Sequence, residues 1–358
     1  MTAPLAPGAT IGIIGGGQLG RMLAIAAARL GYRTIVLEPQ ADCPAAQVTN
    51  RQIIAAYDDE KALAELAEAS DVVTYEFENV PVEAAIALAQ KVAVYPPARA
   101  LEISQDRVTE KSFLNGIGIS TAEFLPVDND GDIVEALKKF GGSGILKTRR
   151  LGYDGKGQRV FREFSEDPSG IFADMGGVPL IFEAFVSFER EISIIAARGI
   201  DGSHAAFDPA ENVHRDGILH SSTIPASVGV GTAGAARGMA FSILDALDYV
   251  GVIGVEFFAM NDGTLLVNEI APRVHNSGHW TEAACAVSQF EQHIRAVAGL
   301  SLDGGSRHSD CVMENLIGDD VDRSAELLAE NDVVLHLYGK VEARPGRKMG
   351  HFTRLKRL

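Results

Sequence analysis

The sequence predicts a mixed α/β and α+β protein, in which a doubly wound parallel-sheet domain precedes an antiparallel domain and a small C-terminal domain. In residues 10–100, short apolar β-branched strands alternate with helices, as they do in a parallel sheet that is covered on both faces. Between residues 144 and 207, glycine-rich turns join short strands, which is typical of antiparallel α+β structure. Residues 301–358 combine a few short strands with a basic, glycine-containing end.

The spacing of apolar residues predicts the elements in order. In the N-terminal region the strands are predicted at Thr10–Ile14, Arg33–Leu37, Ile53–Ala56 and Asp71–Tyr75, and the helices at Gln18–Leu30 and Asp58–Ala69. A helix from about Asp106 to Gly116 is followed by a predicted loop through Pro126 and residues 128–131. Later strands are predicted at Gly144–Lys147, Gln158–Phe161, Leu180–Phe185, Glu191–Ala197 and His204–Phe207, and later helices at Gly238–Tyr249 and Trp280–Ala298.

Length and composition restrict the class of protein. The 358 residues are enough for two or three domains, and the net charge of −16 argues against a general nucleic-acid binder. No apolar run approaches the length of a membrane span, and the first residues lack the pattern of a signal peptide. The cysteines Cys43, Cys285 and Cys311 have no metal-ligand spacing, so we expect reduced thiols and a cytoplasmic protein without nucleic-acid or membrane partners.

Two glutamates, Glu256 and Glu269, lie on either side of a predicted β-hairpin. With Asp262-Gly263 as a two-residue loop, the count along both strands places the two glutamates opposite each other. Phe258, Met260, Leu265 and Val267 would share their face. Opposed like charges are destabilising, and a divalent cation such as Mg²⁺, which takes one or two carboxylates plus phosphates, removes the conflict. An exposed pair, or a loop one residue longer that breaks this register, remains the alternative.

A glycine-rich loop follows the first predicted strand. Residues Gly15–Gly20 fit the pattern G-x-G-x-x-G, and Glu38 ends the next strand, where the ribose-binding acid of a dinucleotide fold would stand. The helix that begins at Gln18 would direct free N–H groups towards a phosphate. This pattern indicates a dinucleotide site, and a tight turn without a ligand is the alternative.

A second glycine-rich stretch, Gly152–Gln158, lies between two strands and therefore is neither a Walker loop nor a Rossmann turn. Its three glycines and the nearby Lys147 and Lys156 suit a mobile flap over a polyphosphate. A flexible surface hairpin with solvated lysines is the alternative.

Taken together, the motifs resemble the ATP-grasp superfamily of carboxylate–amine ligases, and within it the N5-carboxyaminoimidazole ribonucleotide synthetases of purine biosynthesis. The resemblance covers nearly the whole chain and rests on Gly15–Met22, Tyr75–Asn79, Gln105–Lys111, Gly152–Gln158, Glu211–Leu219, Asn268–Thr281 and Tyr338–His351. It implies an ATP-grasp fold and a homodimer. It also implies a pre-ATP-grasp domain at 1–105, an ATP-grasp domain at 106–300 with lobes at about 118–187 and 188–300, and a C-terminal domain at 301–358.

The same resemblance assigns the site residues. It places ATP at Arg107, Lys147, Gly152, Tyr153, Asp154, Gly155, Lys156, Gly157, Gln158, Glu183, Ala184, Phe185, Val186, Glu191, His214, Asn268 and Glu269. It places Mg²⁺, which Mn²⁺ can replace, at Glu256 and Glu269. The ribonucleotide would contact Gln18, Leu19, Glu76, Tyr153, Asp154, Arg273, His275, Asn276, Lys340 and Arg347. The chemistry would depend on Lys147, Arg273, His275 and Asp154, while His279 and Trp280 receive no chemical role.

The implied reaction begins with attack of bicarbonate on the γ-phosphate of ATP, which gives carboxyphosphate and ADP. The exocyclic amine of 5-aminoimidazole ribonucleotide then takes the carboxyl group. Asp154, His275 or the released phosphate could accept the amine proton. Three rivals stay open: a formate-dependent glycinamide ribonucleotide ligase, an NAD-dependent oxidoreductase and a non-catalytic nucleotide sensor. A solvated tail is the alternative for the basic cluster around Lys340 and Arg347.

Overall fold

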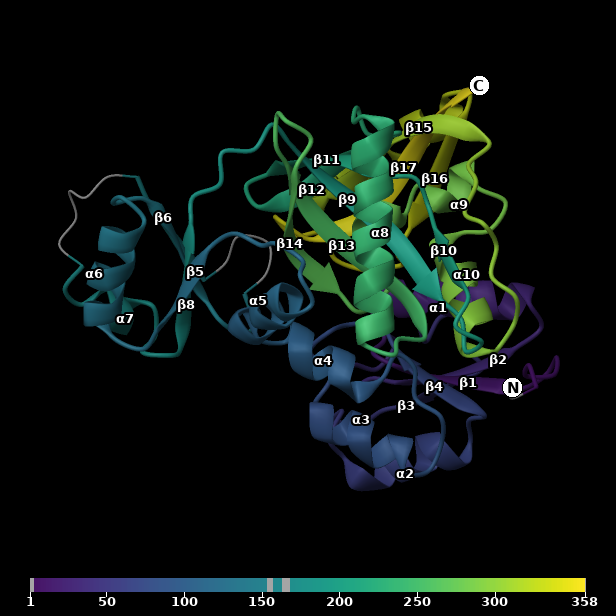
Figure 1. Cartoon of the computed structure of the whole chain (residues 1–358). Coiled ribbons are helices and arrows are strands. Elements are labelled where there is room, and N and C mark those ends of the chain that lie inside the picture. The colour runs from purple at the N-terminus through teal and green to yellow at the C-terminus, as the bar shows by residue number, and fades with distance from the viewer. Residues whose placement is uncertain (1–2, 153–156, 163–167, 358) are drawn as a thin grey trace.

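The computed structural model describes residues 3–152, 157–162 and 168–357. Its strands form a four-stranded parallel sheet, a four-stranded antiparallel sheet and a nine-stranded sheet. The four-stranded antiparallel sheet belongs to a lobe that stands apart from the rest of the molecule, at the left of Figure 1. The mixed α/β and α+β class predicted from the sequence is therefore confirmed.

The N-terminal sheet has the strand order β3-β2-β1-β4, and every neighbouring pair is parallel. Its strands are β1 (Thr10–Ile14), β2 (Arg33–Leu37), β3 (Arg51–Ile53) and β4 (Val72–Tyr75), and its helices are α1 (Gln18–Arg29), α2 (Glu60–Glu68), α3 (Val82–Ala89) and α4 (Ala98–Ser104). The predicted third strand, Ile53–Ala56, is wrong, because the strand ends at Ile53 and the next apolar side chain, Ile54, is 61% exposed. Helices α3 and α4 were not predicted. Each follows a proline, Pro81 or Pro97, rather than a capping side chain.

The separate lobe carries β5 (Phe124–Val127), β6 (Gly144–Thr148), β7 (Gln158–Phe161) and β8 (Leu180–Ala184), with helices α6 (Asp130–Lys139) and α7 (Ile171–Asp174). The loop predicted through Pro126 and residues 128–131 is wrong. Pro126 lies in β5, which is an edge strand and therefore tolerates a residue without an N–H. Asn129 then caps α6 by accepting a hydrogen bond from the backbone of Asp132.

The large sheet has the order β14-β13-β9-β11-β12-β15-β17-β16, with β10 beside β9. Its strands are β9 (Arg190–Arg198), β10 (His204–Ala206), β11 (Ala210–Arg215), β12 (Ile218–Ile224), β13 (Gly251–Ala259), β14 (Leu265–Ala271), β15 (Ser309–Ile317), β16 (Val333–Leu337) and β17 (Lys348–Arg357). Because β12 pairs with β15, the C-terminal strands continue the sheet that carries the predicted metal hairpin.

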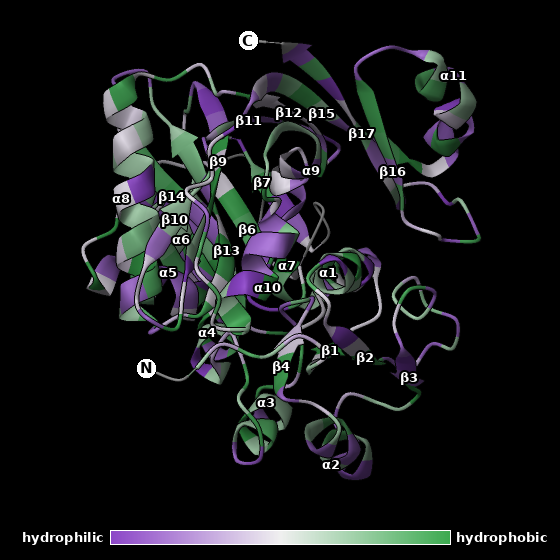
Figure 2. Cartoon of the chain, turned by 90° about the vertical axis from the view of Figure 1, so that its right-hand side faces the viewer, coloured by the Kyte–Doolittle hydropathy of each residue, from purple (hydrophilic) through white to green (hydrophobic). Residues whose placement is uncertain are grey.

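The helices of this part are α5 (Arg107–Gly116), α8 (Val230–Ala246), α9 (Thr281–Ala284), α10 (Gln289–Val297) and α11 (Ser324–Ala329). Short 3₁₀ helices cover Asn276–Gly278 and Gly318–Arg323. The single helix predicted at Trp280–Ala298 is wrong. The first helix ends before Cys285, whose backbone forms an isolated antiparallel β-bridge with Arg307. Ser288 then caps a new helix by accepting a hydrogen bond from the N–H of Glu291. Helix α8 begins at Val230, earlier than the predicted Gly238, and packs against β9 and β13. Strand β13 is largely hydrophobic in Figure 2.

The hairpin of β13 and β14 pairs Glu256 with Glu269, as predicted, but by a different register along the strands. The loop has three residues, Asn261–Gly263, and is closed by hydrogen bonds between Met260 and Thr264 and between Gly263 and Met260. Phe258 therefore pairs with Leu266 instead of Val267, and a β-bulge at Asn268 restores the register at the glutamates.

The predicted sharing of one face is wrong for two of the four apolar side chains. Leu265 and Val267 pack with Phe257 in the core that contains the buried alanines of α8. Phe258 lines a cavity together with the two glutamates.

Candidate active site

A cavity of about 420 Å³ lies where the N-terminal sheet, the separate lobe and the large sheet meet. Most of the predicted site residues line it: Gln18, Leu19, Arg107, Lys147, Gly152, Gly157, Gln158, Glu191, His214, Glu256, Asn268, Glu269, Arg273, His275 and Asn276. Tyr153, Asp154, Gly155 and Lys156 fall outside the described residues. The cavity therefore brings together side chains that come from all three thirds of the sequence.

The paired carboxylates of Glu256 and Glu269 form the acidic end of the cavity. Burial and the neighbouring charge of Glu269 raise the pKa of Glu256 to about 7. Burial alone would raise the pKa of Glu269, but the Arg107 guanidinium, 3.0 Å away, outweighs it and lowers that pKa. Such a conflict between adjacent carboxylates is relieved by a cation.

The ligands present suit Mg²⁺, which takes part of its coordination from phosphates, better than they suit a metal ion that is coordinated by protein side chains alone. Within residues 3–152, 157–162 and 168–357, no group of three or more His, Cys, Asp and Glu side chains is arranged to hold a metal ion. Glu256 and Glu269, with the amide of Asn268 on the same strand, offer only oxygen ligands and leave positions for phosphate oxygens.

Arg107 and Lys147 supply the positive charge of the cavity next to the acidic pair. The ammonium of Lys147 lies 2.7 Å from the carboxylate of Glu183, and Arg107 also donates to the carbonyl of Gly152 at 3.0 Å. Burial would raise the pKa of Glu183, but Lys111 and Lys147 outweigh it and lower the pKa to about 2. Two fixed cations beside two carboxylates give the charge pattern that a metal-bound polyphosphate requires.

Arg273 and His275 follow β14 and extend the site towards the N-terminal domain. The guanidinium of Arg273 pairs with Glu78, and this charge lowers the pKa of Glu78 to about 2 against the opposing effect of burial. Burial, followed by the charge of Arg273, lowers the pKa of His275 to about 3, so the imidazole is neutral.

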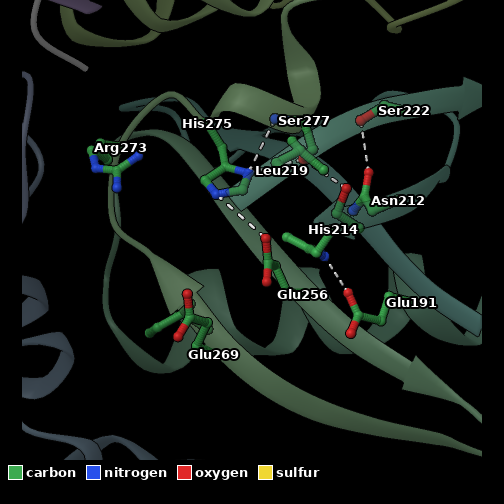
Figure 3. Close-up of polar contacts among 12 residues, drawn as sticks. Glu191, Asn212, His214, Leu219, Ser222, Glu256, Glu269, Arg273, His275 and Ser277 are labelled. Carbon is green, nitrogen blue, oxygen red and sulfur yellow. Dashed lines mark hydrogen bonds and ion pairs between the residues drawn. The ribbon is translucent and has the colours of Figure 1, made fainter. Parts of the chain in front are cut away.

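A chain of hydroxyl groups orients the neutral imidazole of His275. The Ser193 hydroxyl donates to the Ser277 hydroxyl at 2.7 Å. The Ser277 hydroxyl lies 2.9 Å from Nδ1 of His275, as Figure 3 shows. Ser277 therefore donates to Nδ1, which leaves the proton on Nε2. That nitrogen lies 3.5 Å from Glu256 and directs its N–H at the carboxylate.

Glu191 and His214 form an ion pair on adjacent strands β9 and β11 (Figure 3). Burial would lower the pKa of His214, but the carboxylate of Glu191 outweighs it and raises the pKa. The Ser222 hydroxyl donates to Asn212 at 2.8 Å and so links β12 to β11, the strand that carries His214.

The glycine loop Gly15–Gly20 is occupied by carboxylates of the protein itself. Glu76 accepts hydrogen bonds from the N–H groups of Gly17 and Gly20, and Glu38 accepts one from Gly16 at 2.9 Å. Because these carboxylates take the N–H groups that a pyrophosphate would need, the structure argues against the predicted dinucleotide site. Gln18 and Leu19, at the start of α1, still face the cavity.

Lys340 and Arg347 lie beside the cavity, outside its lining, whereas their neighbour Lys348 lines it. The Lys340 ammonium donates to the carbonyl of Lys348 at 2.7 Å, and Arg347 donates to the carbonyl of Glu342 at 2.9 Å. Burial, followed by the charge of Arg347, lowers the pKa of Lys340 to about 8.

Of the four residues Glu183–Val186, none lines the cavity: the carboxylate of Glu183 is 4% exposed beneath Lys147, and Phe185 is 50% exposed. Ser193, Ser277 and Glu78 received no role from the sequence, although Glu78 and Ser277 stand inside matched motifs. Lys348 was predicted only as a member of the basic cluster for the phosphate, and it lines the cavity.

Replacement of Ser277 by alanine should remove the preference of His275 for the tautomer with its proton on Nε2. Without the hydroxyl donor at Nδ1, we expect the ring proton to distribute over both nitrogens. Nitrogen NMR of histidine-labelled protein would show this as a shift of the His275 ring signals towards intermediate values, with Ser277→Thr as the conservative rescue. Unchanged ring signals would contradict the arrangement, and His275→Asn identifies the signals.

The chain matches known protein families along most of its length. Family profiles match at residues 8–105 (ribonucleotide synthetase preATP-grasp domain), 112–290 (ATP-grasp domain) and 311–357 (phosphoribosylaminoimidazole carboxylase C-terminal domain). The chain is 67% identical, over 98% of both chains, to the N5-carboxyaminoimidazole ribonucleotide synthase of Brucella melitensis.

Two solved structures extend the likeness to the fold. The ADP complex of an N5-carboxyaminoimidazole ribonucleotide synthetase matches with a TM-score of 0.96 at 42% identity, over 99% of this chain and 94% of that one. The Aspergillus clavatus N5-carboxyaminoimidazole synthase, in complex with ADP and the aminoimidazole ribonucleotide, matches with a TM-score of 0.90 at 29% identity, over 98% and 94%. The predicted ATP-grasp fold is thus confirmed, and the chain belongs to the N5-carboxyaminoimidazole ribonucleotide synthase family of ATP-grasp enzymes.

Proposed function

We propose that this protein is an ATP-dependent carbon–nitrogen ligase that carboxylates 5-aminoimidazole ribonucleotide with bicarbonate, in purine biosynthesis. The observation that carries the proposal is the composition of one cavity. The acidic pair Glu256 and Glu269 lines it together with the cations Arg107 and Lys147, and Arg273, four residues after the second glutamate, lines it as well. The family membership and the ADP and ribonucleotide complexes of relatives support the same assignment.

The nucleotide would lie between the separate lobe and the large sheet. Arg107 and Lys147 would bind its phosphates, Glu191 its ribose hydroxyls, and the backbone of Glu183–Val186 its adenine edge. His214 would hold Glu191 in place, and the segment Gly152–Gln158 would cover the phosphates. Mg²⁺, held by Glu256 and Glu269 with Asn268 beside them, would neutralise charge on the phosphates during transfer, and Mn²⁺ would replace it.

The chain would then position a labile acyl phosphate next to the amine. Arg273 would bind carboxyphosphate, because its guanidinium is fixed by Glu78 and cannot lose its charge. The neutral His275 would orient the reacting groups, and Asp154, His275 or the phosphate would take the amine proton. Closure over the site would exclude water from carboxyphosphate.

The ribonucleotide would enter from the N-terminal domain. Gln18, Leu19 and Glu76 would contact its ring and ribose, and Lys340 and Arg347 would bind its 5′-phosphate. Tyr153 and Asp154, which fall outside the described residues, would also contact this substrate. The amide atoms of Asn276 are buried beside the cavity without a hydrogen-bond partner among the described residues, so this side chain has unused capacity for a ligand.

We also propose the domain division 1–105, 106–300 and 301–358, a homodimer, and a cytoplasmic location. The buried thiols of Cys43, Cys285 and Cys311 fit a reducing compartment. No helix in the described part of the chain has the length and apolar content needed to cross a bilayer.

The test of the function is ADP release by the purified protein with each substrate omitted in turn. We expect release to require both bicarbonate and 5-aminoimidazole ribonucleotide. Release with formate and glycinamide ribonucleotide would favour the sister ligase, and nucleotide binding without turnover would favour a sensor. A change in NADH fluorescence when the protein is titrated into the cofactor would favour the oxidoreductase alternative.

Lys340→Ala is expected to raise the KM for the ribonucleotide about 10-fold or more while nucleotide affinity stays nearly unchanged, because one cation facing the phosphate is lost. The wild-type KM should itself rise as the pH increases through about 8, because the pKa of Lys340 in the protein without ribonucleotide is lowered to about 8 and the side chain loses its charge above that pH. Lys340→Arg keeps the charge and should remove this rise. An unaltered KM in Lys340→Ala would refute the placement of the phosphate.

A further inference from the structure

One face of α5 contacts the strand that carries Glu269. Arg107, Glu110 and Lys111 are spaced i, i+3 and i+4 along the helix, so their side chains project from the same side. The side chain of Asp106 caps the helix and also binds the guanidinium of Arg149, three residues before the glycine-rich stretch Gly152–Gln158. In Figure 1, α5 lies between the separate lobe and the large sheet. The helix is thus placed to join the two sides of the cavity.

Glu110 and Lys111 hold the backbone on either side of Glu269. The carboxylate of Glu110 accepts a hydrogen bond from the N–H of Ile270 at 2.7 Å. The ammonium of Lys111 donates to the carbonyl of Asn268 at 3.0 Å. The two side chains are 2% and 0% exposed, so water does not compete for these bonds. The peptide groups that flank Glu269 are therefore fixed by two consecutive residues of α5.

The β-bulge explains why such a support is needed. Asn268 has no residue opposite it on β13, and the normal strand ladder is interrupted at this point. A bulge re-aims the side chains next to it, and an unpaired carbonyl in the interior is costly. Lys111 satisfies this carbonyl and so stabilises the backbone conformation that turns Glu269 towards Glu256.

The same ammonium also reaches the phosphate-binding side. Lys111 lies 3.3 Å from one oxygen of Glu183, and the other oxygen of Glu183 lies 2.7 Å from Lys147. Glu183 thus bridges a fully buried cation and the cation at the cavity wall. Burying a lysine without exposed surface costs free energy. The partners that Lys111 has in return are the carbonyl of Asn268, beside the metal-binding pair, and the carboxylate of Glu183, which binds Lys147.

We propose that Glu110 and Lys111 are positioning residues of the ATP site. Lys111 sets the distance between the metal-binding Glu269 and the phosphate-binding Lys147. It holds the backbone of the strand that carries Glu269, and it also holds Glu183, the carboxylate that pairs with Lys147. Glu110 fixes the other side of the same strand. The inference rests on the proposed nucleotide and metal site.

The test measures binding rather than turnover. Mn²⁺ binding to the full-length protein in the presence of ADP is followed by electron paramagnetic resonance, and ADP affinity by calorimetry. In Lys111→Met, which keeps the length of the side chain and removes the charge, we expect Mn²⁺ affinity to fall about 10-fold or more, as for residues that orient metal ligands. Wild-type affinities in this variant would overturn the proposal.

Leu114→Ala is the matched control for loss of stability. Leu114 is fully buried one turn further along the same helix and belongs to the hydrophobic core cluster of this part of the molecule. We expect this variant to lower the thermal unfolding midpoint at least as much as Lys111→Met, with Mn²⁺ and ADP affinities close to wild type. An equal loss of affinity in both variants would mean that Lys111 acts only through stability and would refute its positioning role.

Glu110 gives a second, independent comparison that holds even if Lys111→Met does not fold. Glu110→Leu removes the acceptor for Ile270, whereas Glu110→Gln retains an oxygen in the same place. We expect Mn²⁺ affinity to fall in Glu110→Leu and to recover in large part in Glu110→Gln. Equal affinities in the two variants would overturn the inference. Wild-type protein that binds no ADP would instead refute the proposed function.

Discussion

Glu269→Gln is expected to abolish Mg²⁺-dependent ADP release while the fold stays intact. The substitution keeps the size of the side chain and removes one of the two charges that would hold the metal. A loss of about 4 kcal/mol of transition-state stabilisation corresponds to a decrease of about 10³-fold in turnover. It also leaves Arg107 without its carboxylate partner at 3.0 Å, so the guanidinium is free to move away from the phosphates.

The measurement compares turnover, Mn²⁺ binding and thermal unfolding in the same preparation. Glu211→Gln is the control, because Glu211 pairs with Arg190 at the same 3.0 Å distance but lies outside the cavity lining. We expect full turnover in the control and a similar small change in unfolding midpoint in both variants. Residual turnover of Glu269→Gln above about 10% of wild type would place the metal elsewhere.

The hairpin shows what could be predicted from the sequence. Asp262-Gly263 correctly indicated a turn, and the count correctly placed Glu256 opposite Glu269, yet the residues between them are paired differently. The longer loop and the bulge at Asn268 shift the register in opposite directions and cancel at the glutamates. The bulge is supported by Lys111, 157 residues earlier in the chain, and a local pattern contains no information about such a contact.

Elements with strong local signals were predicted well, and those that depend on distant partners were not. Strands β1 and β2 are buried runs bounded by clear turns and were located correctly. The pairing of β12 with β15, which joins the C-terminal strands to the large sheet, depends on residues about ninety positions apart in the chain. In the site, motif matches located the charged ligands, while the neutral serines that orient His275 carried no separate signal.

Arg273→Met is expected to uncouple ATP cleavage from carboxylation. If Arg273 stabilises carboxyphosphate, its loss should reduce formation of the carboxylated ribonucleotide about 10²- to 10³-fold, comparable to removal of one oxyanion-binding group. ADP release should fall less, because Arg107 and Lys147 would still bind the nucleotide phosphates. The amount of ADP released per carboxylated product should therefore rise, measured with labelled bicarbonate trapped as product.

The stability of this variant needs its own control, because Glu78 is left without its partner. The loss should be on the order of 2 kcal/mol in unfolding free energy, less than for a fully buried pair, since Glu78 is 31% exposed. Arg198→Met removes an arginine with the same 17% exposure from an ion pair with Asp245, outside the cavity lining, and should leave coupling unchanged.

The double variant Arg273→Met/Glu78→Gln separates chemistry from folding. Neutralising Glu78 should restore most of the lost stability, because no unpaired carboxylate then remains at that position. Carboxylation should stay as low as in Arg273→Met, since a methionine cannot bind an acyl phosphate. If carboxylation returned together with stability, Arg273 would act only as the partner of Glu78, and carboxyphosphate would have to be stabilised by another cation of the cavity, such as Lys348.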